Sequence, residues 1–301
     1  MYDYIIFILL VFLFDNIESK KQLRIFGGRD IEENEYPHIA RMEILKVGKD
    51  IMYRYHICTS AVLTPEWTLT AAHCFGDINK LLLTRRYRHS KAFKIALTHL
   101  NDIKPIIWFG NVRDEPSKNT YSDIVDSVLH PATRLGVARV GLHKYSYYQN
   151  DVGLLRTEAI RIKQYAKLSA LPAVSLKGHE VEVFGYGLTN SSDGIIGDTL
   201  YLKKPLQVLT AMIASCPGGD IAKYPMLCVV RDCGHASAVG PGDSGGPLLH
   251  PSGVVATLSV GPRLDFESQM DQNFHIGTFT PISSYLDWIF DVTNNNNTRR
   301  A

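Results

Sequence analysis

Short apolar runs alternate with turn-rich stretches through most of the chain. The clearest of these runs are TSAVL (59–63), WTLTAA (67–72), DVGLL (151–155), VEVFGYG (181–187), GVVATLSVG (253–261) and HIGTFT (275–280). Runs of this length, bounded by glycine, proline and polar residues, are typical of the strands of an all-β sandwich or barrel. No internal repeat stands out, so the pattern predicts one all-β body.

A different pattern appears near the C-terminus. Over Pro281–Thr293 the apolar residues recur at helical spacing, at Ile282, Tyr285, Leu286 and Ile289. Pro281 is suited to the first position of a helix, so we expect a terminal helix whose apolar face packs on the body. The polar, aperiodic residues 294–301 are predicted to be a disordered tail.

An unbroken apolar run, Tyr4–Phe14, lies near the N-terminus. It is too short to span a membrane and is typical of the core of a signal peptide. The basic residue that usually precedes such a core is absent, because Asp3 stands there. We expect residues 1–19 to be a signal peptide ending at Ser19, and the protein to be secreted; a membrane anchor is the alternative interpretation.

Composition narrows the choice of partners. The chain has 301 residues, 45% hydrophobic and 21% charged, which suffices for one large domain or two modest ones. Its net charge of +2 argues against a nucleic acid or a membrane surface as partner. We interpret the basic run 85–94 as a solvated loop, and the weakly patterned segment 77–117 as a long surface insertion.

The five cysteines are Cys58, Cys74, Cys216, Cys228 and Cys233. In a secreted protein they favour disulfides, and an odd count leaves one without an intramolecular partner. They do not form the paired C-x-x-C pattern of a zinc site, and the histidines are scattered, so we expect neither a metal nor a cofactor. Asn190 and Asn296 each begin a glycosylation sequon.

The segment Gly242–Pro247, GDSGGP, carries the first candidate for catalysis, Ser244. A serine hydroxyl is a weak nucleophile unless a base and oxyanion donors surround it. Gly242 lets the backbone turn so that its own N–H and that of Ser244 can converge on one oxygen. A glycine-flanked serine alone is more often only a turn.

Two upstream residues could supply the base and the residue that orients it. His73 ends the apolar run LTAAHC, and Asp151 precedes the apolar run after YYQN. Taken singly, the histidine reads as a packed structural residue and the aspartate as a cap. Their joint occurrence with Ser244 instead favours a nucleophile, a base and an orienting carboxylate.

Four segments, IFGG (25–28), LTAAHC (69–74), NDVGLL (150–155) and GDSGGP (242–247), occur in this order. In them the chain resembles the chymotrypsin/trypsin family of serine endopeptidases, over about Ile25–Thr293. The resemblance implies a trypsin-like domain over residues 25–293, made of two packed antiparallel six-stranded β-barrels with a C-terminal helix. The active site would lie between the barrels.

The resemblance also assigns roles to residues. Ser244 would be the nucleophile, His73 the general base and then acid, and Asp151 the carboxylate that orients His73. Gly242 and Ser244 would supply the oxyanion-hole N–H groups. Ser259 matches a serine that hydrogen-bonds the catalytic aspartate, and the backbone of Val260–Gly261 would pair with an extended substrate.

Family members are made as inactive precursors, and this chain has a matching junction. Cleavage between Arg24 and Ile25 would release residues 20–24 as a propeptide. The new amine of Ile25 would then bury itself against Asp243 and shape the oxyanion hole. The propeptide contains no cysteine, so it would not stay tethered by a disulfide.

The resemblance implies disulfides between Cys58 and Cys74 and between Cys216 and Cys228. Cys233 would then be the odd thiol, although a Cys216–Cys233 pair is the alternative. A third disulfide of the family would need a cysteine where Gly240 stands and a second one beyond Gly261, and both are absent.

Substrate preference follows from counting back from Ser244. The floor of the primary pocket would be Ala238, followed by Val239, with walls at Gly261 and Gly277. An arginine in such a pocket would lack a partner for its charge, whereas a large apolar side chain would gain from burial. We expect cleavage after large apolar residues; Asp232 or Asp265 reaching a remodelled pocket is the alternative.

Two other functions are alternatives to a catalytically active protease. The first is a protease homologue without catalysis that acts as a binding or regulatory protein, although this chain keeps all three triad residues. The second is an α/β-hydrolase, with Asp271 and His275 following the serine, but the sequence after Ser244 is strand and turn and not helix. The expected partners are a protein or peptide substrate, an activating protease and a protein inhibitor, and we expect a monomer.

Overall fold

The structure is a computed structural model that describes residues 28–32, 34–47, 52–75, 103–110, 119–140, 143–187, 205–216, 226–230, 239–261 and 275–294. Several predicted features lie outside these residues: the signal peptide (1–19), the propeptide (20–24), Ile25, both sequons, Cys233, Ala238 and the tail beyond residue 294.

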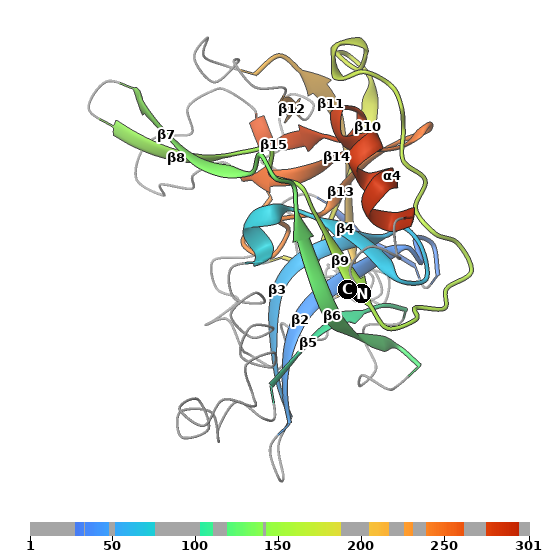
Figure 1. Cartoon of the computed structure of the whole chain (residues 1–301). Coiled ribbons are helices and arrows are strands. Elements are labelled where there is room, and N and C mark those ends of the chain that lie inside the picture. The colour runs from blue at the N-terminus through green and yellow to red at the C-terminus, as the bar shows by residue number, and fades with distance from the viewer. Residues whose placement is uncertain are drawn as a thin grey trace, which may run out of the picture.

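The first half of the chain forms a closed antiparallel barrel (Figure 1), with strand order β2-β3-β4-β9-β6-β5. Closure pairs every strand on both sides and so leaves no edge. Its strands are β2 (Ile39–Val47), β3 (Met52–Val62), β4 (Trp67–Thr70), β5 (Ile103–Trp108), β6 (Tyr121–Leu129) and β9 (Gly153–Thr157).

The second half forms another closed barrel, with order β11-β10-β13-β14-β15-β12 and a β11–β12 pairing that closes it. The short β1 (Arg29–Asp30) pairs with β11 outside this ring. The strands are β10 (Glu180–Gly185), β11 (Gln207–Ala214), β12 (Leu227–Val230), β13 (Pro247–His250), β14 (Gly253–Val260) and β15 (His275–Pro281). The predicted fold class is therefore confirmed: two six-stranded antiparallel barrels.

An apolar cluster joins the two barrels. It brings Trp108 of β5 together with Phe184 and Tyr186 of the second barrel. The Arg41 guanidinium lies between two of these rings, 5.6 Å from the Trp108 centroid and 5.3 Å from that of Tyr186. The Tyr186 hydroxyl donates to the Ile39 carbonyl at 3.3 Å. These contacts hold the two barrels together.

The interpretation of residues 77–117 as a surface insertion is wrong at its C-terminal end. Ile103–Trp108 is β5, which closes the first barrel by pairing with β2 and β6. Ile106, Ile107 and Trp108 are fully buried. A strand buried on both faces reads as a continuous apolar run without alternation, which weakens the period-2 signal. The part at 77–102 lies outside the described residues.

The terminal helix is present but begins later than predicted. Pro281 still belongs to β15, where it pairs with Ala256. A 3-10 turn (Ser283–Tyr285) follows, and then α4 (Leu286–Asn294). Tyr285 and Ile289 pack against residues of both barrels. Among the described residues, no helix is long and apolar enough to cross a membrane.

An antiparallel hairpin that the sequence did not predict connects β6 to β9. It consists of β7 (Arg134–Val140) and β8 (His143–Gln149), which pair with each other and with no other strand of the described residues. Figure 1 shows this hairpin extending away from both barrels. Its returning strand leads directly into the segment that carries Asp151.

Candidate active site

The candidate nucleophile lies in a tight turn just before β13. Gly242 and Gly245 lie on either side of Ser244 and have φ angles of +96° and +76°. Residues other than glycine rarely adopt such positive φ angles. A Cβ on Gly245 would also overlap Thr70 Oγ1. The turn therefore needs glycine at Gly245, and it presses the backbone beside Ser244 against the end of β4.

The candidate base, His73, lies three residues beyond Thr70, in the 3-10 turn Ala72–Cys74. Its Nδ1 lies 2.7 Å from Oδ2 of Asp151, and its backbone N–H donates to Oδ1 at 2.9 Å. Ser259 Oγ donates to the same Oδ2 at 2.6 Å. Because a carboxylate oxygen only accepts, Nδ1 carries a proton, and in the neutral imidazole Nε2 is then the acceptor.

Asp151 is fully buried, whereas the side chain of His73 is 18% exposed. Among the described residues the hydrogen-bonded chain runs from Ser259 through Asp151 to His73 and does not extend to Ser244 Oγ. Three donors therefore satisfy the buried carboxylate, and the basic nitrogen of His73 keeps its lone pair.

Two backbone donors near Ser244 are open to a ligand. Neither the N–H of Gly242 nor that of Ser244 donates to another described residue. The neighbouring carbonyls are held: Gly242 O accepts from His56 Nε2 at 2.9 Å and Thr59 Oγ1 at 3.0 Å, and Ser244 O accepts from Thr59 N–H at 2.9 Å. Fixed carbonyls keep the turn rigid, so the open N–H groups suit a developing oxyanion.

The residue before Asp151 is a positioning residue that the sequence did not single out. Asn150 has φ of +51°, which asparagine tolerates better than most residues. Its side chain accepts from Tyr285 Oη at 2.9 Å and donates to Ala132 O at 2.9 Å. Tyr285, just before α4, therefore holds the turn that presents Asp151.

Sequence reasoning also missed an aromatic neighbour of His73. Tyr148, near the end of β8, stacks on the imidazole with ring centroids 4.9 Å apart and planes at 20°. The only signal in the sequence was its position, three residues before Asp151. The projecting hairpin thus contributes one wall of the site.

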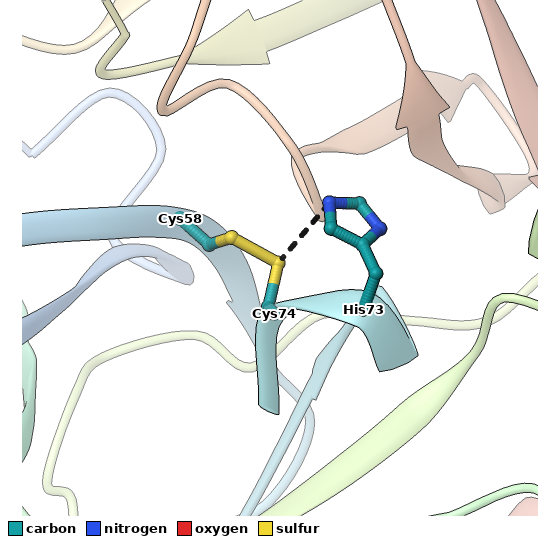
Figure 2. A group of neighbouring side chains, drawn as sticks. All are labelled: Cys58, His73 and Cys74. Carbon is teal, nitrogen blue, oxygen red and sulfur yellow. Dashed lines mark hydrogen bonds between the residues drawn. A yellow bond between two sulfur atoms is a disulfide. The ribbon is translucent and has the colours of Figure 1, made fainter. Parts of the chain in front are cut away.

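Figure 2 shows the disulfide Cys58–Cys74 beside His73. Sγ of Cys74 lies 3.9 Å from Nε2 of His73, so two sulfurs and an imidazole gather in one place. A metal would need thiolates, and both sulfurs here are joined in the disulfide. The bond instead ties β3 to the turn that carries His73.

The second disulfide of the structure joins Cys216 to Cys228 in the second barrel. Both disulfides are those that the family resemblance implies. Cys233 lies outside the described residues, and the alternative pair with Cys216 is not formed here.

Asp243, next to Ser244, is a fully buried carboxylate. It accepts from Gly187 N–H at 2.6 Å and from Gly240 N–H at 2.7 Å. Burial raises the pKa of Asp243 to about 7, and the two backbone hydrogen bonds oppose the rise. A Cβ on Gly185 or Gly187 would overlap this side chain, which explains the glycines of the FGYG run.

The structure brings three of the four predicted pocket residues together. A Cβ on Gly261 would lie 3.1 Å from Val239 Cγ2, and one on Gly277 would lie 3.2 Å from the same atom. Val239 itself is buried in the core of the second barrel. Ala238, the fourth residue, lies outside the described residues. The described part of this region is apolar.

Comparison with known proteins agrees with this geometry. The family model described as Trypsin matches residues 25–289. Kallikrein 1-related peptidase b3 of Mus musculus is 27% identical over 282 residues, which cover 90% of each chain. Chymotrypsin-like elastase family member 1 of Canis lupus familiaris is 25% identical, covering 91% of this chain and 93% of its own. Serine protease SSP1 of Scolopendra subspinipes is 26% identical, covering 90% and 83%.

Proposed function

The chain belongs to the trypsin family of serine proteases, and from that premise we propose that it is a catalytically competent endopeptidase with Ser244, His73 and Asp151 as its triad. One observation carries the proposal. His73 is held by Asp151 so that Nε2 is free to accept a proton, beside a glycine-framed Ser244 with two open N–H donors.

The proposed reaction follows from these groups. Ser244 Oγ attacks the carbonyl carbon of the scissile bond while its proton passes to His73 Nε2. The oxygen of the tetrahedral intermediate becomes an oxyanion and accepts from the N–H groups of Gly242 and Ser244. His73 then gives the proton to the departing amine. Water repeats the sequence on the acyl-enzyme and restores Ser244.

Substrate binding would complete the hydrogen bond between Ser244 Oγ and His73 Nε2. Catalytic hydrogen bonds are often long in the free enzyme and tighten only in the complex. The seating of Gly245 against Thr70 and Ala71 supports this, because those residues directly precede the turn that carries His73.

Active-site labelling with a fluorophosphonate tests the proposal. We expect the mature protein to be labelled at Ser244 and to hydrolyse peptides, and Ser244→Ala to lose both properties with a rate loss of several orders of magnitude. Ser252→Ala is the control, because Ser252 lies beyond β13 and bonds only His250 and Ser169 among the described residues. Absence of labelling would instead favour a binding or regulatory homologue.

We further propose that the protein is a zymogen activated by cleavage between Arg24 and Ile25, residues outside those described. The surroundings of the Asp243 carboxylate support this proposal. Its carboxylate is fully buried, and no cationic side chain of the described residues pairs with it. The ammonium group of a new N-terminal Ile25 would supply that charge. An Arg24→Gln precursor should stay inactive after treatment with an activating protease that activates the wild type.

For substrate preference we propose cleavage after large apolar residues. The buried Val239 and the lack of side chains at the nearby Gly261 and Gly277 support this, because an unpaired arginine charge there would cost several kcal/mol. Matched peptides that differ only before the scissile bond test it. A higher kcat/KM for Phe than for Arg is expected, and the reverse order would overturn this part of the proposal alone.

We also propose that the protein is secreted. Two disulfides support an oxidising compartment, in addition to the apolar segment at 4–14. Expression in a eukaryotic host, followed by N-terminal sequencing of the protein in the medium, tests this. The expected N-terminus is Lys20 or, after activation, Ile25.

A further inference from the structure

Two histidines of the second barrel face each other at the end of β13 that lies away from Ser244. His250 is the last residue of β13, and His179 directly precedes β10, the neighbouring strand. His179 Nδ1 lies 3.1 Å from His250 Nε2. The ring centroids are 5.2 Å apart. Neither residue has a part in the proposed catalysis.

The hydrogen bonds of this pair define where its protons lie. His250 Nδ1 accepts from the backbone N–H of Ser252 at 3.2 Å, so in the neutral ring the proton is on Nε2. That proton points to the lone pair of His179 Nδ1. One proton therefore bridges two ring nitrogens, and a cation could replace it there.

The spacing of the two nitrogens suits a transition metal. With metal–nitrogen bonds of about 2.0–2.1 Å, two imidazole nitrogens stand about 2.9 Å apart at a right angle and about 3.3 Å apart at the tetrahedral angle. The observed 3.1 Å lies between these values. At this separation the ion would lie off the line between the two nitrogens, so each ring would rotate by about 40° to aim its lone pair at the ion, a motion open to the exposed His179 and the half-buried His250.

A hydrogen-bond acceptor for the other ring nitrogen of His250 is also in place. When a metal binds Nε2 of His250, Nδ1 becomes the N–H and needs an acceptor. Ser252 Oγ lies 2.8 Å from that nitrogen, and Ser169 Oγ lies 2.7 Å from Ser252 Oγ. The backbone N–H of Ser252 would then turn to water, because that residue is exposed.

Both histidines stand on fixed backbone. His179 N–H donates to Leu176 O at 3.0 Å, and His179 O accepts from Ile213 N–H at 3.0 Å. His250 pairs with Gly253 in the hairpin between β13 and β14. The backbone positions of both ligands are thus fixed before an ion binds, and the reorganisation is confined to the two imidazoles and to the hydrogen bonds of Ser252.

We propose that His179 and His250 form a two-histidine site for a borderline divalent cation, Cu²⁺, Ni²⁺ or Zn²⁺, with water at the remaining positions. Imidazole nitrogen is the preferred ligand of these ions, whereas Mg²⁺ and Ca²⁺ prefer oxygen. The bound ion would tie the β13–β14 hairpin to the segment before β10. This inference is independent of the proposed proteolytic function.

Isothermal titration with NiCl₂ and ZnCl₂, on protein carrying Ser244→Ala to prevent self-digestion, tests the site. We expect one equivalent of metal to bind, and His179→Gln or His250→Gln to weaken its binding by roughly tenfold or more. His130→Gln is the control, because His130 lies against Tyr285 and Trp288 and should leave the titration unchanged. Mg²⁺ should give no binding at this site.

Thermal unfolding gives a second measurement. Ni²⁺ should raise the Tm of the parent protein and fail to raise that of His179→Gln, an exposed position whose backbone bonds any residue can make. Because His179→Gln should keep its fold, its far-UV circular dichroism should match the parent. Equal affinity and an equal rise in Tm in parent and variants would overturn the proposal.

Discussion

Ser259 Oγ donates a hydrogen bond of 2.6 Å to Oδ2 of Asp151, the carboxylate oxygen that also faces Nδ1 of His73. Ser259 belongs to β14 of the second barrel, and Asp151 lies two residues before β9 of the first. The bond therefore joins the barrels at the candidate triad, and it fixes the rotation of the carboxylate that orients the base.

Removing this bond should weaken catalysis without unfolding the protein. We expect Ser259→Ala to lower kcat/KM roughly 10- to 100-fold, because a hydrogen bond to a charged group contributes about 1.5–3 kcal/mol. The matched control is Ser122→Ala, which removes a 2.6 Å bond to Glu158 O elsewhere in the first barrel. If both variants kept full activity, Ser259 would have no orienting role.

Tyr148 should position His73 through its ring rather than its hydroxyl. Aromatic pairs contribute about 0.5–1.5 kcal/mol beyond area burial, so Tyr148→Ala should lower kcat about 2- to 10-fold. Tyr148→Phe keeps the stacked ring and should restore kcat. Steady-state kinetics on one peptide series separates kcat from KM; an equal loss in the Phe variant would assign the effect to the hydroxyl.

Asp243 should make the precursor less stable as the pH rises. Its folded pKa of about 7 lies above the ordinary 3.8, so the folded state binds the proton more tightly than the unfolded state. The free energy of unfolding should therefore fall as the pH rises from about 4 to about 7 and then level off.

Urea unfolding of the Ser244→Ala precursor at pH 5 and pH 7 measures this fall. Asp243→Asn should flatten it, and Asp287→Asn, an exposed helix position, should leave it unchanged. Cleavage after Arg24 should also reduce it, because an ammonium partner lowers the pKa of a carboxyl. A slope that survives in Asp243→Asn would contradict the assignment.

Two glycines with similar φ angles should respond differently to alanine. Gly245 and Gly178 have φ of +76° and +82°, but only at Gly245 would a Cβ meet packed atoms. Gly178→Ala should cost about 1 kcal/mol of stability, the strain of the backbone alone. Gly245→Ala should cost more and abolish hydrolysis, since Thr70 would push the turn of Ser244 away. Urea denaturation and peptide assays compare them directly.

Local patterns in the sequence predicted those parts of the protein whose causes are local. The glycines around Ser244 are required by the φ angles of their own turn, and the half-buried strands show in short apolar runs. The helical spacing of the apolar residues predicts the terminal helix. It does not predict where the helix starts, because the pairing of Pro281 with Ala256 keeps Pro281 in β15. The position before a helix and the end of a strand suit proline equally well, so the sequence could not separate them.

Contacts across the fold could not be predicted, because they depend on how distant segments meet. Nothing in the sequence near Tyr148 indicates that its ring stacks on His73. Nothing near His179 indicates that its Nδ1 lies 3.1 Å from Nε2 of His250. The β7–β8 hairpin brings Tyr148 to His73, the pairing of β10 with β13 brings His179 to His250, and closure of the first barrel makes Ile103–Trp108 a core strand. The sequence by itself determined which residues could perform the chemistry, since each motif is a local requirement of backbone or side chain. Tertiary packing alone decided what surrounds them, because closing a barrel juxtaposes strands that are far apart along the chain.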